Sequence, residues 1–422
     1  TSAPCDAMML WVFLALCAVA HARVTYEGYQ VIEVHPRSVQ DVDFVRQLGD
    51  NKQMKISFWK EPVRLNSIEF DVPPVSSMMV KQVLADNGIP FTIVWNDLQQ
   101  RIDQTEAARI SARFSADPSN QILSDYQRHD TINTWLDSMG SQYAMATVRS
   151  IGNSYEGRDM RAIRISSGSG RRSIVLDCGI HAREWITVST CIYFIQTLLE
   201  QYNSDTNVRA MVDNYDFHIL PVANPDGYEY SHTDDRMWRK TRSPTDDFLC
   251  TGTDANRNFD AFWGEAGVSF DPCAATYPGT GPFSEVETRN IRDWASGVSN
   301  KILYMNIHSY TQLWLVPWGY HPTTPYPDDY DELARVGELA MDALFTVNGR
   351  QFVVGTPPDL LYSVSGGALD WGKASGGFKY SYSPELRPAS AAEGGFILPP
   401  EDILPAGRET FAALQSHCEN ME

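Results

Sequence analysis

The chain has few basic residues and, beyond its first 22 positions, no long apolar run. Its 422 residues include 34 Lys and Arg against 53 Asp and Glu, which gives a formal net charge of −19. No basic run or basic domain is present that could release counterions from phosphates, so we expect no nucleic-acid partner. No segment after residue 22 offers the roughly 20 apolar residues that cross a membrane, so we expect no membrane partner.

Several sequence motifs are also absent, and each absence disfavours a class of protein or a modification. The chain lacks internal repeats, low-complexity tracts and a Gly-x-Ser-x-Gly motif. Without that motif a serine nucleophile would lack its usual structural context, so a serine hydrolase is disfavoured. No Asn-x-Ser/Thr acceptor occurs, and N-glycosylation is not expected. The seven cysteines are too few for a disulfide scaffold, and the length predicts two folded units.

Residues 1–22 are predicted to be a leader that contains a secretory signal peptide. An apolar run from Met8 to Ala20 is followed by the small-x-small cleavage signal Ala20-His21-Ala22, which makes Arg23 the first processed residue. No Lys or Arg precedes the run, so we expect translation to start at Met8 or Met9. An N-terminal anchor is the alternative, but the run is short for a membrane span. The processed protein is therefore expected to be secreted.

Residues 23–108 are predicted to form a small α+β domain. Strand and helix patterns follow one another as strand, helix, strand, strand, helix, strand. The strands are expected at Tyr29–Val34, Lys55–Trp59, Ser67–Val72 and Phe91–Trp95, and the helices at Val39–Leu48 and Ser76–Asn87. This order predicts the split βαβ, ferredoxin-like arrangement with antiparallel pairing. Such a fold does not by itself define an activity.

A polar helix over Asn96–Ser115 is predicted to connect this domain to the rest of the chain. It carries isolated arginines, and an exposed connector of this kind in a secreted protein is a site for a trypsin-like protease. We place the connector at 109–113, with Arg109 and Arg113 as the candidate cleavage sites. An ordinary solvated linker helix is the alternative.

Residues 114–422 are predicted to form a three-layer α/β domain with a mixed, mostly parallel central sheet. Helical patterns occur at Asp130–Met139 and Thr187–Tyr202. The clearest strand patterns are Met145–Val148, Arg161–Ile165, Ser173–Cys178, Asp216–Leu220 and Lys301–Asn306.

A cluster of ligand-type residues follows one of these strands. Gly179 ends the apolar strand Ser173–Cys178, and His181 and Glu184 come directly after it. Active sites of open α/β sheets lie beyond the carboxyl ends of strands, and an imidazole and a carboxylate at this spacing can bind one cation. His308 also follows a strand pattern, so it is the candidate third ligand.

Five segments resemble zinc metallocarboxypeptidases of the A/B type. They are Gly179-Ile-His-Ala-Arg-Glu-Trp185, Pro221-Val-Ala-Asn-Pro-Asp-Gly-Tyr228, Arg236-Met-Trp-Arg-Lys-Thr-Arg242, Asp254-Ala-Asn-Arg-Asn258 and His308-Ser-Tyr310. The resemblance implies an inhibitory activation segment up to about residue 113 and a peptidase domain over 114–422.

The resemblance also implies the roles of individual residues. It assigns one Zn²⁺ per chain to His181, Glu184 and His308, with Glu385 as the base that activates the zinc-bound water. It assigns Arg239 to the developing oxyanion. The other implied assignments are Asp254 as partner of a zinc-bound histidine, Arg183, Asn256, Arg257, Ser309, Tyr310 and Tyr362 as substrate contacts, and the disulfides Cys178–Cys191 and Cys250–Cys273.

Leu369 occupies the position where B-type enzymes carry an aspartate for C-terminal Lys or Arg. An apolar residue there implies a preference for apolar or aromatic C-terminal residues, because a buried unpaired cation is costly. The resemblance thus implies a secreted, monomeric zymogen in a digestive lumen. Its expected partners are peptides with a free C-terminus, an activating trypsin-like protease and proteinaceous carboxypeptidase inhibitors. A non-catalytic binding protein with this fold is the alternative, although every matched position is filled.

Overall fold

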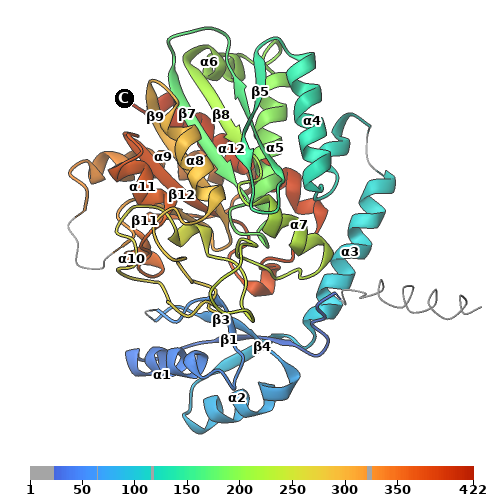
Figure 1. Cartoon of the computed structure of the whole chain (residues 1–422), viewed down its shortest axis with the longest axis vertical. Helices are drawn as coiled ribbons and strands as arrows, with labels where there is room; N and C mark the ends of the chain where they lie inside the picture. The colour runs from blue at the N-terminus through green and yellow to red at the C-terminus, as the bar shows by residue number, and fades with distance from the viewer. Residues whose placement is uncertain (1–22, 64, 116–117, 321–325) are drawn as a thin grey trace, which may run out of the picture.

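The computed structural model describes residues 23–63, 65–115, 118–320 and 326–422 (Figure 1). The leader predicted over residues 1–22, with its start at Met8 or Met9, lies outside the described residues. A small domain lies beneath a larger one, and a long helix joins them along one side (Figure 1). Among the described helices, none combines the length and apolarity needed to cross a bilayer.

The small domain has the predicted split βαβ order. Its elements are β1 (Gln30–Val34), α1 (Val39–Asp50), β2 (Ser57–Lys60), β3 (Ile68–Val72), α2 (Pro74–Asp86) and β4 (Phe91–Trp95). The sheet order is β2-β3-β1-β4, and every pairing is antiparallel. Ser38 caps α1, since its side chain accepts a hydrogen bond from the Asp41 N–H. The fold prediction for this segment is confirmed.

The large domain is built on an eight-stranded sheet of order β11-β10-β12-β9-β7-β8-β6-β5. Its strands are β5 (Ala146–Asn153), β6 (Asp159–Ile165), β7 (Arg172–Cys178), β8 (Tyr215–Leu220), β9 (Lys301–Ser309), β10 (Leu313–Leu315), β11 (Val353–Gly355) and β12 (Tyr380–Leu386). The central strands β8, β7, β9 and β12 are parallel. Strand β10 is antiparallel to β12, and the β5–β6 and β6–β8 pairings are also antiparallel.

Helices cover both faces of this sheet, which gives the predicted three layers. Successive strand residues point to opposite faces. Ile174 and Leu176 of β7 therefore pack in one apolar cluster, and Val175 packs in another. The first cluster includes residues of α4 (His129–Gln142), α5 (Trp185–Glu200), α6 (Thr206–Asn214), α9 (Tyr330–Asn348) and α12 (Ile403–Asn420). The second includes residues of α8 (Val286–Ser296) and α11 (Ala368–Ala374). The first cluster also includes Tyr228 of α7 (Pro225–Thr233), and the short helix α10 (Pro357–Leu360) follows β11.

The turn after β7 depends on a glycine. Gly179 has φ +70°, and a Cβ at this position would lie 2.7 Å from Cγ2 of Val188. Only glycine adopts this backbone without steric cost, so it lets the chain turn sharply from β7 into α5. The predicted Cys178–Cys191 disulfide forms and links the end of β7 to α5. This turn carries the predicted metal ligands.

A buried carboxylate of the small domain joins the two domains. Glu69 of β3 accepts hydrogen bonds from the Tyr310 hydroxyl at 2.5 Å and from the Ala391 N–H at 2.9 Å. Lys60 of β2 lies 3.0 Å from the same carboxylate and also donates to the Ala389 carbonyl. The small domain is thus anchored to loops of the large domain at the end where the parallel strands finish.

Candidate active site

The structure brings His181, Glu184 and His308 together. β7 and β9 are parallel neighbours, with Cys178 opposite Ile307, so the residues that follow or end these strands meet at one edge of the sheet. Nδ1 of His181 lies 2.8 Å from Oε1 of Glu184 and 3.1 Å from Nδ1 of His308. Nδ1 of His308 lies 3.3 Å from Oε2 of Glu184. All three side chains are buried.

This cluster fits a zinc ion by its chemistry and its spacing. Two imidazoles and one carboxylate are a common catalytic zinc set, and tetrahedral ligands about 2.0–2.1 Å from zinc lie about 3.3 Å from one another. The three nitrogen and oxygen distances range from 2.8 to 3.3 Å. The ligand atoms are therefore already gathered at close to the separation that zinc requires.

Neighbouring side chains orient both imidazoles. Oδ1 of Asp254 lies 3.1 Å from Nε2 of His181, and Oδ1 of Asn306 accepts from Nε2 of His308. A hydrogen bond at Nε2 places the proton there and leaves the Nδ1 lone pair free for a metal. The Asp254 position was inferred from sequence, whereas Asn306 was missed. Asn306 lies two residues before His308 on the same strand, which is the signal that could have indicated it.

Nearby charges favour the ionised form of Glu184 in the cluster and of Asp254 beside it. Burial opposes ionisation of Glu184, but His181 and His308 outweigh it and hold the pKa of Glu184 below its usual value. Burial likewise opposes ionisation of Asp254, while Arg239 and Arg257 hold the pKa of that carboxyl well below the ordinary range. Nη2 of Arg239 donates to Oδ2 of Asp254 at 2.8 Å.

Glu385 lies beside these residues. It belongs to β12, which pairs in parallel with β9 so that Glu385 is opposite His308. Burial raises the pKa of the Glu385 carboxyl well above its usual value, and the nearby charge of Glu184 raises it further. A carboxyl with a raised pKa accepts a proton more readily than an ordinary glutamate, which suits a general base.

A cavity of about 50 Å³ extends from this cluster. His181, His308 and Glu385 lie along it together with predicted substrate residues on loops, on the short 3₁₀ helix Ala255–Arg257 and on α11. The predicted residues that line it are Arg239, Asn256, Arg257, Tyr362 and Leu369. Because these side chains come from distant parts of the sequence, the fold alone brings them to one site.

The guanidinium of Arg257 is held at the cavity wall by backbone and side-chain groups. Its Nε donates to the Gly267 carbonyl at 2.9 Å, and Nη2 lies 3.4 Å from the Tyr362 hydroxyl. The Asn256 side chain is fixed by the Ala368 N–H, which donates to its Oδ1 at 2.9 Å. An amide and a guanidinium held in this way can bind a planar carboxylate.

The apolar end of the cavity is formed around Leu369 of α11. Leu369 packs with Leu315 and Leu313, and Val364 and Pro357 also line this end. A buried carboxyl that sequence reasoning missed, Asp370, follows it. Its oxygens accept from the Gly319 N–H at 2.8 and 3.0 Å, and burial raises its pKa to about 7. Because both carboxyl oxygens of Asp370 already accept hydrogen bonds from the Gly319 backbone, this group is a poor partner for a cationic substrate side chain.

Three predicted substrate residues do not line the cavity. Arg183 is buried with its guanidinium 4.0 Å from the centroid of the Phe396 ring. The Ser309 N–H donates to Oε2 of Glu184 at 3.2 Å, and the Tyr310 hydroxyl donates to Glu69 of the small domain. In the full chain Ser309 therefore contacts the metal cluster and Tyr310 contacts the small domain, while Arg183 packs on Phe396 of the large domain.

The small domain also supplies an acidic residue that sequence reasoning missed. Burial raises the pKa of Glu61, and the charges of Arg239, Arg257 and Arg183 oppose that rise. Glu61 therefore shares an electrostatic environment with the arginines that were assigned to substrate. No local motif marks this residue, because its placement depends on how the two domains dock.

A buried three-residue ligand set beside a carboxyl base defines a metal-dependent hydrolase. Residues 132–413 match the zinc carboxypeptidase family model, and residues 32–105 match the carboxypeptidase activation peptide. The chain belongs to the zinc carboxypeptidase family and carries its activation peptide, so it is a metallocarboxypeptidase in zymogen form.

Relatives of both specificity types are similar to the chain. Carboxypeptidase A1 of Sus scrofa is 35% identical over 415 residues, which cover 97% of this chain and 98% of the relative. Carboxypeptidase B of Astacus astacus is 42% identical over 294 residues, which cover 69% of this chain and 95% of the relative. The structure of carboxypeptidase A from Helicoverpa armigera superposes with a TM-score of 0.85 at 26% identity, covering 94% of this chain and 98% of that chain.

Proposed function

We propose that the chain is a secreted zymogen whose peptidase domain removes apolar or aromatic residues from peptide C-termini. One observation carries this proposal: the cavity that begins at the cluster of His181, Glu184 and His308 ends at the apolar side chain of Leu369. A chromogenic peptide with C-terminal Phe or Leu, assayed before and after trypsin treatment, tests it. The chain should be inactive before the treatment and active after it.

His181, Glu184 and His308 would hold one zinc ion per chain. When bound, zinc supplies a Lewis acid that polarises the scissile carbonyl and lowers the pKa of water. Glu385 takes up the proton of the attacking water and returns it to the leaving amine. Arg239, fixed by Asp254, donates hydrogen bonds to the oxygen on which negative charge develops. The non-catalytic alternative does not explain why all of these groups are in place.

Asn256 and Arg257 bind the terminal carboxylate of the substrate. This contact restricts the reaction to the last peptide bond, since an internal residue has no free carboxylate to offer. Tyr362 lies beside Arg257, and we propose that it covers the bound substrate. Arg183, Ser309 and Tyr310 contribute further substrate contacts once the small domain is removed.

Replacing Leu369 by Asp is expected to reverse the side-chain preference. A carboxylate at this position would pair with a substrate Lys or Arg and would be left unpaired by Phe or Leu. The ratio of kcat/KM for C-terminal Arg over Phe should rise by about 10²-fold or more. Paired chromogenic peptides that differ only in the last residue measure this ratio.

Leu369→Ile is the matched control, and it should keep the preference for apolar residues. An unaltered Arg-to-Phe ratio in Leu369→Asp would show that another residue sets the specificity. The names of the A1 and B relatives do not decide which C-terminal residue this chain prefers, because that preference depends on the residues that line its own cavity.

We propose the division 23–108 for the inhibitory domain, 109–113 for the connector and 114–422 for the peptidase domain. The proposed connector 109–113 is part of helix α3 (Leu98–Ser115). Arg109 is only 4% exposed, contrary to the expected exposed connector, because it pairs with Asp125 at 2.6 Å. Arg113 also pairs with Asp125, but its side chain is 51% exposed, and Phe114 after it is 89% exposed. The greater exposure of these residues favours cleavage after Arg113.

Arg113→Gln is therefore expected to slow activation by trypsin by about 10-fold or more, since an accessible basic side chain is lost. N-terminal sequencing of the wild-type product should begin at Phe114. Arg109→Gln should still be cut after Arg113 but should melt at a lower temperature, because it leaves Asp125 with one partner fewer. A product that begins at Ile110 would assign the cleavage to Arg109 instead.

The remaining proposals concern partners and location. The activation peptide requires a protease partner, for which we propose a trypsin-like enzyme. The structure of bovine thrombin-activatable fibrinolysis inhibitor, 33% identical, is in complex with tick carboxypeptidase inhibitor and covers 70% of this chain and 97% of that chain at a TM-score of 0.65. This relative supports a proteinaceous inhibitor for our chain too. We propose a monomer that acts in a digestive lumen.

A further inference from the structure

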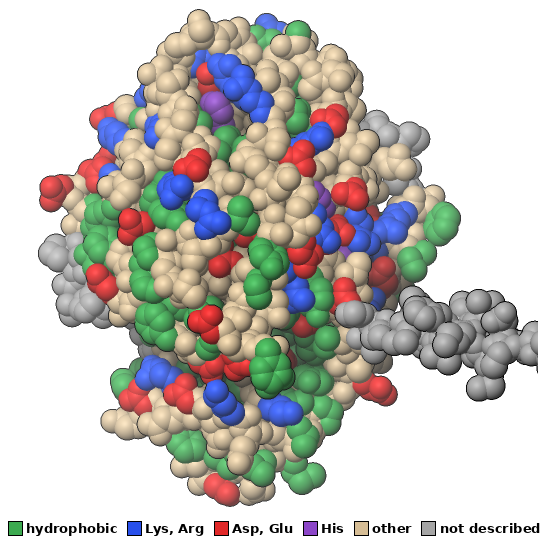
Figure 2. Space-filling model, in the orientation of Figure 1, with side chains coloured by type: hydrophobic (Ala, Val, Ile, Leu, Met, Phe, Trp, Pro, Cys, Tyr) green, Lys and Arg blue, Asp and Glu red, His purple; other side chains and the backbone are tan. Residues whose placement is uncertain are grey.

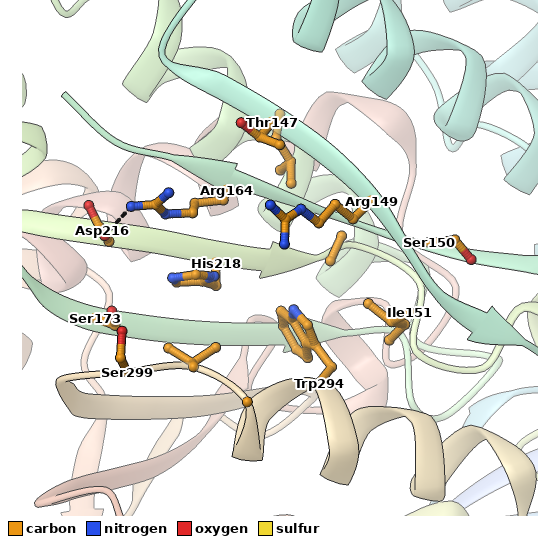
Figure 3. A pocket seen from close by; sticks show the side chains of 14 residues that line it. Thr147, Arg149, Ser150, Ile151, Arg164, Ser173, Asp216, His218, Trp294 and Ser299 are labelled. Carbon is orange, nitrogen blue, oxygen red and sulfur yellow. Dashed lines mark hydrogen bonds and ion pairs between the residues drawn. The ribbon is translucent and has the colours of Figure 1, made fainter. Parts of the chain in front are cut away.

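A trough of about 460 Å³ lies on the face of the large sheet beside α8 (Figure 3). It includes Ser173 and Asp216, the paired second residues of β7 and β8, whereas His181 lies past the other end of β7. Its volume falls in the range of small-molecule sites. The trough is therefore separate from the candidate active site.

Strand register places two arginines over this trough. Thr147 of β5 pairs with Arg164 of β6, which in turn pairs with His218 of β8, so these residues form one row on the sheet face. Arg149 is opposite Ala162, two residues further along, and is thus a diagonal neighbour of Arg164. Figure 3 shows both arginine side chains extending over the trough next to His218.

The trough carries more positive than negative charge. Nη2 of Arg164 donates to Oδ2 of Asp216 at 2.7 Å, and the Nε and Nη1 groups make no hydrogen bond to a described residue. The exposed Arg149 side chain has no ion pair or hydrogen bond to any residue in the described ranges. Two guanidinium groups thus face one carboxylate, within a protein of net charge −19. An anion would relieve the repulsion between them.

His218 adds a hydrogen-bonding group without adding charge. Burial and the nearby Arg164 lower the pKa of His218 to about 4, so its imidazole is neutral near pH 7. A neutral imidazole offers one N–H donor and one acceptor. Figure 2 shows acidic and basic side chains interspersed over the visible face of the molecule.

The other half of the trough is apolar. The Trp294 indole of α8 lies near Ile151 of β5, at the opposite end from Asp216 (Figure 3). An indole face is a suitable surface for a flat or apolar ring. The trough therefore combines an anion-binding half with a ring-binding half.

We propose that this trough binds a small ring compound that carries a phosphate or sulfate ester. The oxyanion lies between Arg149 and Arg164, whose planar guanidinium groups match the geometry of such oxygens. His218 donates a hydrogen bond to the same group, and the ring packs against Trp294. No bond is made or broken, so this is a binding site outside the peptidase reaction.

Titration calorimetry of the full-length zymogen with phenyl phosphate and with phenyl sulfate tests the proposal. At least one ester should bind saturably, and the tighter one identifies the kind of ester. Arg149→Ala should weaken that binding by about 10-fold or more, because charge-assisted hydrogen bonds are lost. Arg408→Ala, which removes an exposed arginine of α12, is the matched control and should bind as the wild type does.

Trp294→Leu separates the two halves of the trough. It should weaken binding of the phenyl esters and leave binding of inorganic phosphate unchanged. Thermal melting and trypsin-released peptidase activity should match the wild type in Arg149→Ala, which shows that the variant is folded. The proposal is overturned if neither ester binds saturably, if Arg149→Ala binds as tightly as the wild type, or if Arg257→Ala abolishes binding, since that would place the ester in the active site.

Discussion

Replacement of Glu385 by Gln is expected to lower kcat/KM of the trypsin-activated enzyme by roughly 10²–10⁴-fold, the usual contribution of a general base. Gln keeps the size and hydrogen-bonding shape of the side chain but cannot take up a proton. Glu385 lies opposite His308 in the sheet and lines the same cavity, so the loss of its proton-accepting group alone should lower the activity. A chromogenic C-terminal substrate measures the loss.

Zinc content provides the control for this variant. Glu385 is not one of the three clustered ligands, so Glu385→Gln should retain one zinc per chain by metal analysis. Equal zinc with greatly reduced activity would assign the residue to proton transfer. A decrease of less than about 10-fold would mean that the base lies elsewhere in the cavity.

Replacement of His308 by Ala is expected to remove both zinc and activity. Two ligands remain in this variant, and a catalytic zinc site requires three from the protein. Because the metal contributes several kcal/mol to transition-state stabilisation, kcat/KM should fall by about 10³-fold or more. Metal analysis after gel filtration and the peptide assay measure the two effects.

Asp254→Asn provides a graded comparison for the same site. Asp254 contacts Nε2 of His181 but is not placed to reach the metal, so its replacement should weaken zinc affinity by about 10–100-fold. Added zinc should restore part of the activity to Asp254→Asn, which also loses the charged partner of Arg239, and should leave His308→Ala inactive. If His308→Ala kept a full complement of zinc, the assignment of this histidine as a ligand would be wrong.

Long elements with one clear period could be predicted from the sequence. The expected strand Ser173–Cys178 corresponds to β7 (Arg172–Cys178), and the expected helix Asp130–Met139 lies within α4 (His129–Gln142). Their apolar residues face the core, so local pattern and burial agree. The expected strand Met145–Val148 covers only the first half of β5, because the second half has a single apolar side chain, Ile151, and therefore shows no period.

The edge of the large sheet could not be predicted in the same way. β10 and β11 have three residues each, too few to show a period. Strand β12 contains Pro384, which normally argues against a strand that is paired on both sides. Only the surrounding fold makes these segments strands.

The candidate site likewise contains some residues that the sequence predicts and others that only the fold reveals. His181, Glu184 and His308 could be inferred because each follows or ends a recognisable strand. Glu385 was placed by resemblance, because its position depends on the unpredicted strand β12. Glu61 and Asp370 were missed, because contacts across domains and hydrogen bonds from loop backbone leave no local pattern.

The position of bound zinc tests the central claim most directly. Crystals of the zymogen, measured at the zinc absorption edge, should show an anomalous peak about 2.0–2.2 Å from Nδ1 of His181, Nδ1 of His308 and a carboxylate oxygen of Glu184. Such a peak would place the ion between the strand ends that the fold brings together. A peak elsewhere, or none at this cluster after the crystals are soaked in zinc, would contradict the account.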